Sequence, residues 1–280
     1  RPRAPWILKQ SKNKSKNGKD NTPWIAGKAG KDTIEFRGIV KQKAITPVPI
    51  TVHDPPLFFG KLLQNRMKTG DVFIAEVSRI NPNAEVPKGK TIEPVISTSL
   101  LRVIELCNEE SFNLYAESLL KRTVHAKTGR PGSWTEADSV MKKIIIETLG
   151  NSCQGLLTGV VFADGSGLSR LNRINAALMT WWLTALQRDP TYGQSFVDSL
   201  ALGGKEGTLK KRFSKPLPNG AVVDAKSGYI NGVSCLSGYV SGSGGRRYAF
   251  SVLVNNCSSI GNAKKLQEKI VDAIARSFGN

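Results

Sequence analysis

The sequence has no long apolar run, no closely spaced cysteine pair and no histidine cluster. Because no stretch approaches the roughly 20 apolar residues of a transmembrane helix, we expect no membrane span. The four cysteines form no Cys-x-x-Cys, and His53 and His125 stand alone, so we expect no metal site and no cofactor. Cys235 and Cys257 fall in or near consecutive predicted strands, and the sequence leaves a disulfide between them open.

Acidic residues are few relative to basic ones. The chain has 40 lysines and arginines against 22 aspartates and glutamates, and its net charge of +18 favours an anionic partner. Many lysines lie among Asn, Ser and Gly in residues 1–31, which is typical of a solvated loop and leaves adhesion to an anionic cell-envelope polymer open. The chain lacks zinc-finger spacing, aromatic RNA-binding motifs and a basic amphipathic helix, so we expect no specific nucleic-acid binding.

The start of the chain lacks an initiator methionine and the pattern of a signal peptide. We therefore interpret the chain as a mature product or a fragment. Its apolar content of 40% is sufficient for a hydrophobic core. Residues 80–93 are rich in Pro, Asn, Gly and Lys, which indicates a linker. These observations predict two domains, residues 1–93 and residues 94–280.

The spacing of apolar residues predicts an α+β protein. In the first part we expect two strands within residues 33–52, a helix that begins at Pro55 after the capping Asp54, and a strand at 72–77. In the second part we expect helices at about 97–122, 135–150 and 175–187, the first with an interruption at 109–113. Three strands should follow at about 220–227, 230–240 and 247–255, and a last helix at about 261–277. This order is typical of an antiparallel sheet flanked by helices.

A triplet of chemical interest, Lys226-Ser227-Gly228, follows a short apolar strand and leads into the next strand of a predicted hairpin. About 115 residues upstream, Ser111 and Asn113 form a Ser-x-Asn in a helical stretch. A strand-borne Lys-Ser/Thr-Gly together with Ser-x-Asn makes up two thirds of the active-site set of penicillin-interacting serine enzymes. The third motif of that set, Ser-x-x-Lys, carries the nucleophile.

Short motifs also match by chance, and context has to distinguish them. Two further Lys-Thr-Gly triplets end a helix or lie in a loop between helices, at Lys68 and Lys127. Three Ser-x-x-Lys matches lie in the lysine-rich loop or on polar faces of amphipathic helices, at Ser11, Ser118 and Ser139. Only the triplet at Lys226 follows a strand and precedes a hairpin partner, so we select it as the candidate site.

Five longer strings, in order along residues 97–255, carry a resemblance to a known family. They lie at 111–117, 130–134, 164–170, 206–213 and, in the sheet, 225–228 with 236–239. The chain resembles the D-Ala-D-Ala carboxypeptidase/endopeptidase family of low-molecular-mass penicillin-binding proteins, in the branch with a large insert between Ser-x-x-Lys and Ser-x-Asn. The resemblance implies a β-lactamase/transpeptidase-like fold, with residues 94–280 as the C-terminal part of that domain. Residues 1–93 resemble the end of the accessory insert domain more loosely.

The chain departs from the family pattern in two places. Family members usually have Lys-Thr-Gly-Thr, whereas here Ser227 keeps the hydroxyl and Tyr229 replaces a small hydroxyl residue that helps to hold a substrate carboxylate. The family's Ser-x-x-Lys stands before the insert, and the match from Ser11 to Lys14 is not at a helix start. We therefore expect an N-terminal segment or a second chain to supply the nucleophilic serine.

The resemblance implies acyl transfer on peptidoglycan stem peptides and reaction with β-lactams. Catalytic roles fall on Ser111 and Lys226, which would pass protons to the leaving amine, and on Asn113, which would bind the acyl-chain carbonyl of the substrate. Two lysines held close together can lower the pKa of one of them toward neutrality, which suits a base. The string at 164–170 is expected to shape a turn beneath the site.

Substrate binding falls, by the same resemblance, on Ser227, Gly228 and Tyr229. Ser227 would hold the terminal carboxylate beside Lys226, and the backbone N–H of Tyr229 would form half of an oxyanion hole. The family works in the bacterial cell envelope, so we expect a periplasmic or otherwise extracytoplasmic location. The alternative function is a non-catalytic relative that binds peptidoglycan or a partner protein.

Overall fold

The computed structural model describes residues 8–11, 24–27, 33–38, 52–81, 84–85, 88–89 and 96–279. The chain divides into two compact units, residues 1–93 and residues 94–280. Most of the lysine-rich loop, and residues 48–51 of the second strand expected within 33–52, lie outside the described residues.

The first unit contains a small sheet and one helix. Its three strands have the order β1-β3-β2, and their bounds are β1 Leu8–Ser11, β2 Trp24–Gly27 and β3 Thr33–Arg37. Helix α1, Pro55–Lys68, begins as predicted, because the Asp54 carboxylate accepts a hydrogen bond from the Leu57 N–H at 3.0 Å. Of the two strands expected within residues 33–52, the first corresponds to β3, which pairs with β1 in parallel and with β2 antiparallel.

The prediction of a strand at residues 72–77 is wrong. Residues 72–80 have no regular secondary structure. The Gln64 side chain of α1 donates a hydrogen bond to the Ile74 carbonyl at 2.7 Å, and the Val72 N–H donates to the Met67 carbonyl at 3.0 Å. The backbone of this segment is thus bonded to the preceding helix, and the apolar run at 72–75 alone could not distinguish that partner from a neighbouring strand.

The second unit begins with helices that carry the Ser-x-Asn turn and support the sheet. Their bounds are α2 Leu100–Glu109, α3 Asn113–Thr128, α4 Ala137–Leu149, η1 Asn151–Leu157, α5 Ala176–Arg188, α6 Gly193–Asp198, η2 Gly207–Leu209, η3 Pro218–Gly220, α7 Ile260–Arg276 and η4 Ser277–Gly279. Local sequence sets several starts, since the side chains of Ser99, Asn175 and Ser259 cap α2, α5 and α7. The predicted interruption at 109–113 separates α2 from α3.

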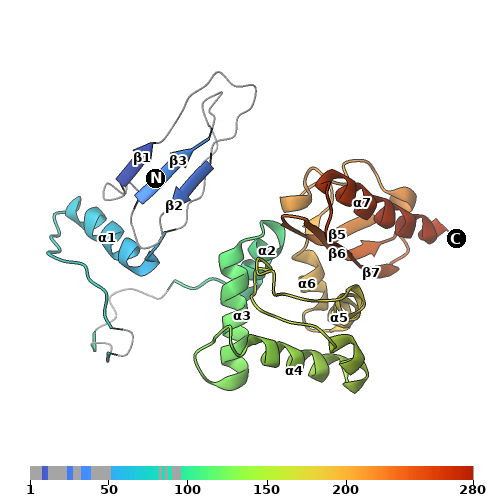
Figure 1. Ribbon diagram of the computed structural model, residues 1–280, viewed down its shortest axis with the longest axis horizontal. Helices are drawn as coiled ribbons and strands as arrows, with labels where there is room; N and C mark the ends of the chain where they lie inside the picture. Colours follow the sequence, from blue (N-terminus) through green and yellow to red (C-terminus); the bar gives the residue numbers. More distant parts are fainter. Residues whose placement is uncertain are drawn as a thin grey trace. The chain divides into compact units, whose positions relative to one another are not determined.

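The sheet of the second unit has four antiparallel strands in the order β4-β5-β6-β7. Their bounds are β4 Ala201–Leu202, β5 Val222–Ile230, β6 Val233–Ser241 and β7 Arg247–Val254. A two-residue turn, Asn231 and Gly232, joins β5 to β6, and Gly232 supplies the positive φ of 79°. The sheet and its flanking helices confirm the predicted α+β architecture (Figure 1).

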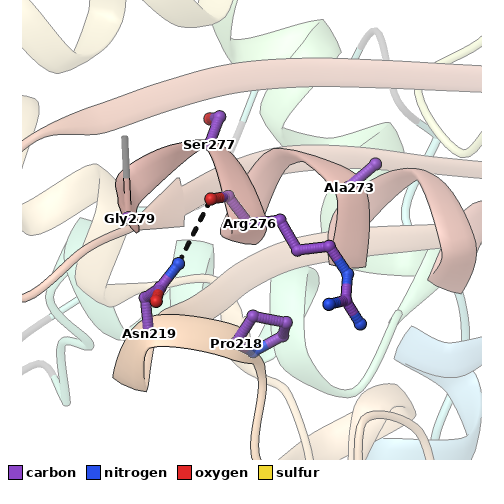
Figure 2. Close-up of a pocket in the computed structure, with 6 residues that line it drawn as sticks. All are labelled: Pro218, Asn219, Ala273, Arg276, Ser277 and Gly279. Atoms are coloured by element: carbon purple, nitrogen blue, oxygen red, sulfur yellow. Dashed lines mark hydrogen bonds between the residues drawn. The ribbon is translucent and has the colours of Figure 1, made fainter.

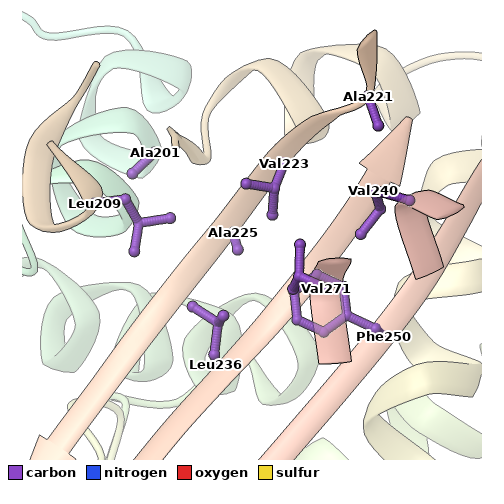
Figure 3. Packing of buried hydrophobic residues seen from close by; sticks show 10 residues of the cluster. Ala201, Leu209, Ala221, Val223, Ala225, Leu236, Val240, Phe250 and Val271 are labelled. Atoms are coloured by element: carbon purple, nitrogen blue, oxygen red, sulfur yellow. The ribbon is translucent and has the colours of Figure 1, made fainter. Parts of the chain in front are cut away.

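The two faces of this sheet are covered by different helices. On one face Val223, Leu236 and Val240 pack with Val271 of α7, as Figure 3 shows. On the other face Tyr239 packs with apolar residues of α5 and α6. Because side chains alternate along a strand, β5 directs Lys226 to the face opposite α7.

Candidate active site

The central feature of the site is a contact between two distant side chains. The Lys226 ammonium on β5 donates a hydrogen bond to the Ser111 hydroxyl at 2.7 Å. It donates a second one to the backbone carbonyl of Ser227, also at 2.7 Å. Ser111 lies in the turn between α2 and α3, 115 residues before Lys226. The structure thus brings together the Ser-x-Asn turn and the Lys-Ser-Gly strand, as the sequence predicted.

Ser111 has a strained backbone. Its φ of 59° lies in the left-handed region, which costs a non-glycine residue about 1–3 kcal/mol. The turn is held by the start of α3, where the N–H groups of Tyr115 and Ala116 donate to the carbonyl of Phe112. Strain of this kind persists where the surrounding fold requires one particular side-chain position, and here that position directs the Ser111 hydroxyl to Lys226.

Burial changes the proton affinity of Lys226. Removal from water lowers the pKa of its ammonium, and the nearby Cys107 thiol of α2 opposes this shift. Burial also raises the pKa of Cys107, with an opposing effect from Lys226. A lysine with a lowered pKa has a larger neutral fraction and can exchange protons with a bonded hydroxyl. No motif or spacing in the sequence relates Cys107 to Lys226.

Ser227 has a hydroxyl partner that sequence analysis missed. The Ser227 hydroxyl donates a hydrogen bond to the Thr208 hydroxyl of η2 at 2.9 Å. Thr208 belongs to the string at 206–213, which carried the family resemblance but received no role. The only sequence signal was its place in that string, because nothing local relates residue 208 to residue 227.

One edge of β5 is open to an added strand. Strand β6 pairs with β5 along its length, from Val222 to Ile230. On the other edge β4 pairs only with Asp224 and Ala225 among the described residues. Lys226, Gly228 and Tyr229 therefore lie where an extended peptide can join the sheet. The Tyr229 side chain is 63% exposed, and Asn113, the first residue of α3, is also exposed.

The other Ser-x-x-Lys and Lys-Thr-Gly matches have different partners. On α3 the Ser118 hydroxyl bonds to the Leu114 carbonyl, and the Lys121 ammonium lies 3.5 Å from the centre of the Trp134 ring. On α4 the Ser139 hydroxyl bonds to the Glu136 carbonyl. Lys142 forms an ion pair with Asp138, Lys127 pairs with Glu147, and Lys68 ends α1. Lys14 of the remaining match lies outside the described residues.

The loop at 164–170 connects the two sides of the site. The Glu117 carboxylate of α3 accepts hydrogen bonds from the backbone N–H groups of Gly165 and Ser166 at 3.1 and 3.0 Å. At its far end the Arg170 guanidinium donates to the Asn231 carbonyl in the turn between β5 and β6, at 2.9 Å. The loop therefore holds the helix that begins at Asn113 and the hairpin of the lysine in a fixed relation.

Comparison with known proteins identifies the family. The sequence profile of the D-Ala-D-Ala carboxypeptidase 3 (S13) family matches residues 4–277. The chain belongs to this family. A D-alanyl-D-alanine carboxypeptidase of Actinomadura sp. (strain R39) is 31% identical over 275 residues, which cover 94% of this chain and 48% of the relative. The carboxypeptidase DacB of Mycolicibacterium smegmatis is 29% identical over 196 residues, which cover 67% of this chain and 39% of the relative. The chain spans about half or less of the length of these curated relatives.

A solved structure establishes the fold of the S13 chain. Penicillin binding protein 4 from Haemophilus influenzae, in complex with a β-lactam, matches with a TM-score of 0.67 and 19% identity. The match covers 91% of this chain and 59% of that chain. The predicted β-lactamase/transpeptidase-like fold is confirmed, with an antiparallel sheet flanked by helices.

A pocket of about 500 Å³ lies elsewhere, at the end of α7 (Figure 2). It is lined by Pro218, Asn219, Ala273, Arg276, Ser277 and Gly279. The Asn219 amide donates to the carbonyls of Ala275 and Arg276, and Arg276 pairs with Asp272. Because these polar groups already cap and brace the helix end, we interpret the pocket as a structural feature. In the described part of the chain no His, Cys, Asp or Glu group is suited to hold a metal ion, and no helix there could span a membrane.

Asp224, two residues before Lys226, is a carboxyl that folding keeps partly protonated. Burial raises its pKa from the ordinary 3.8 to about 6, Arg247 opposes the shift, and Asp198 and Glu206 add to it. The folded chain therefore binds this proton more tightly than the unfolded chain does. The resulting stabilisation is present below about pH 4 and is lost as the pH rises through about 6.

Replacing Asp224 with asparagine should therefore stabilise the chain most at neutral pH. We expect the free energy of unfolding to rise by about 1 kcal/mol near pH 7.5, less than the full pKa shift implies because water screens the half-buried carboxyl, and the gain to become small near pH 4. Urea denaturation at both pH values measures this. Asp272→Asn, which removes a partner from the exposed ion pair with Arg276, should change stability by less than about 1 kcal/mol at either pH. A gain from Asp224→Asn that is equal at both pH values would contradict the assignment.

Proposed function

We propose that the protein containing this chain is a serine-type D-Ala-D-Ala carboxypeptidase/endopeptidase that cleaves peptidoglycan stem peptides through an acyl-enzyme. The observation that carries the proposal is the hydrogen bond between the Lys226 ammonium and the Ser111 hydroxyl in a member of the S13 family. The lowered pKa of Lys226 supports a role in proton transfer. The strained backbone of Ser111 supports a functional turn.

The reaction begins when a serine hydroxyl attacks the carbonyl carbon between the two D-alanines and gives its proton to the lysine of its own Ser-x-x-Lys segment. As the tetrahedral intermediate collapses, the C–N bond breaks and the serine ester remains as the acyl-enzyme. Ser111 donates its proton to the nitrogen of the leaving D-alanine and regains one from Lys226, which is bonded to it. Water then attacks the ester carbonyl, releases the shortened peptide and returns the serine hydroxyl.

The remaining residues bind the substrate. In this proposal the peptide extends along the open edge of β5, and the Asn113 amide donates to its acyl-chain carbonyl. Ser227 holds the terminal carboxylate, with the positive charge of Lys226 nearby. Gly228 lets the substrate backbone approach, and the Tyr229 N–H forms half of the oxyanion hole, a group worth about 100- to 1000-fold in rate.

The nucleophile belongs, in this proposal, to a Ser-x-x-Lys segment outside the chain. An N-terminal segment of the same gene product, or a second chain, would place its serine beside Ser111 and Lys226. We also propose that residues 1–93 are the remainder of the accessory insert domain. The substrate class places the protein in the bacterial cell envelope, outside the cytoplasm.

Release of D-alanine tests this proposal directly. The full-length gene product is expected to free D-alanine from a diacetyl-L-Lys-D-Ala-D-Ala peptide. Ser111→Ala should lower kcat/KM by about 10²- to 10⁴-fold, because the leaving amine then lacks its proton donor. Ser118→Ala is the matched control, since Ser118 is also on the α2–α3 segment but bonds only to the Leu114 carbonyl of its own helix. Equal activity of the two variants would rule out the assigned role of Ser111.

A further inference from the structure

The short helix η2 is wedged between α2 and β5. Gly207 has a φ of 43°, and a Cβ there would lie 2.3 Å from the Glu109 carbonyl at the end of α2. Leu209 is fully buried in the core beneath β5. Its backbone is bonded on both sides, since its N–H donates to the Glu206 carbonyl and its carbonyl accepts from the Gly204 N–H. Thr208, between these two anchors, therefore has a fixed backbone position.

Thr208 presents its hydroxyl to Ser227 from this fixed position. The two hydroxyl oxygens lie 2.9 Å apart, with Ser227 as donor and Thr208 as acceptor. Serine lacks the γ-methyl group of threonine, so its hydroxyl can occupy three staggered positions about χ1. The bond to Thr208 selects one of them. Where the family usually has threonine, this chain has a serine that a second residue orients.

We infer that Thr208 is a positioning residue for the substrate's terminal carboxylate, acting through the hydroxyl of Ser227. The inference rests on the proposed function, because that function assigns the carboxylate to Ser227. A hydroxyl has one donor and two acceptor positions. When the carboxylate binds, the Thr208 hydroxyl donates a hydrogen bond to the Ser227 oxygen, and the Ser227 hydroxyl donates its hydrogen bond to the carboxylate. Both hydroxyls stay neutral, and the carboxylate gains a donor in a fixed orientation.

The expected effect is on binding of the free carboxylate. We compare diacetyl-L-Lys-D-Ala-D-Ala with its C-terminal amide, in the full-length gene product. Thr208→Val keeps the shape of the side chain without its hydroxyl, and it should raise KM and Kd for the free acid about 3- to 10-fold, the effect of one hydrogen bond. The values for the amide and kcat for either peptide should change less than about twofold. Thr208→Ser, which keeps the hydroxyl, should restore wild-type binding.

A double-mutant cycle with Ser227→Ala tests whether Thr208 acts through Ser227. If it does, adding Thr208→Val to Ser227→Ala raises the Kd for the free acid no further. Effects of the two changes that multiply would overturn the inference, as would equal losses for acid and amide or no loss from Thr208→Val.

Equilibrium Kd values separate this inference from the proposed function. If the wild-type protein binds the free acid in a Thr208-dependent way but releases no D-alanine, the inference holds and the proposed function fails. If it releases D-alanine and Thr208→Val binds like wild type, the inference alone fails. The inference is also overturned if the wild-type protein binds the amide as tightly as the free acid, because no carboxylate site then exists.

Discussion

Lys226→Ala in the full-length gene product should lower the rate of acylation by a labelled penicillin by about 10²- to 10⁴-fold, the range of a lost proton-transfer group. Two physical facts give this expectation. The Lys226 ammonium is bonded to the Ser111 hydroxyl at 2.7 Å, so its removal breaks the path of the proton. Burial lowers the pKa of Lys226, and alanine offers no group that could exchange a proton there. Gel fluorescence against time of labelling measures the rate.

The two Lys-Thr-Gly triplets, at Lys68 and Lys127, provide matched controls. Lys127→Ala should acylate within about twofold of wild type, because it loses only an exposed ion pair with Glu147. Lys68→Ala should behave in the same way, since Lys68 lies at the last turn of α1. The three variants remove the same side chain from similar triplets and differ in whether the triplet lies on a strand beside Ser111. Wild-type labelling of Lys226→Ala would remove the central claim about the site.

The second large effect concerns the 280-residue chain by itself. We expect no covalent adduct between this chain and a labelled penicillin, whereas the full-length gene product should form one. In the proposed mechanism, acylation requires a serine activated beside Ser111 and Lys226. Ser118 and Ser139 do not meet this requirement, because the Ser118 hydroxyl bonds to the Leu114 carbonyl of α3 and the Ser139 hydroxyl bonds to the Glu136 carbonyl at the start of α4. Intact mass spectrometry distinguishes the two results.

Three outcomes of that experiment have different meanings. Labelling of the isolated chain at Ser11 would show that the N-terminal Ser-x-x-Lys is the nucleophile after all. Labelling only after a second polypeptide with a Ser-x-x-Lys is added would identify a two-chain site. A full-length product that binds peptidoglycan but never labels would support the non-catalytic alternative. The control for a loss of folded protein is the Ser118→Ala variant, which should be labelled as the wild type is.

Much of the fold followed from local patterns. The short apolar run before Lys226 predicted the strand that carries it, although the expected bounds of 220–227 and 230–240 missed the turn at Asn231 and Gly232. The Asp54 cap likewise fixes where α1 begins. Local patterns failed at 72–77, where a short apolar run predicted a strand. There the Ile74 carbonyl bonds to Gln64 of the preceding helix, and no local signal encodes that partner.

The sequence by itself determined the membership of the S13 family, the order of the long helices and of strands β5 to β7 in the second unit, and which lysine triplet lies on a strand. These are properties of spacing and turn chemistry, which act over a few residues. The sequence did not predict α6 or β4. Only the tertiary structure decided that Lys226 reaches Ser111, that Cys107 lies near Lys226, and that the hydroxyls of Ser227 and Thr208 are bonded. The two hydrogen bonds join residues that are 115 and 19 positions apart in the sequence. Their hydrogen bonds and desolvation depend on how α2, η2 and β5 pack together, and packing is a sum over the whole core that no short stretch of sequence contains.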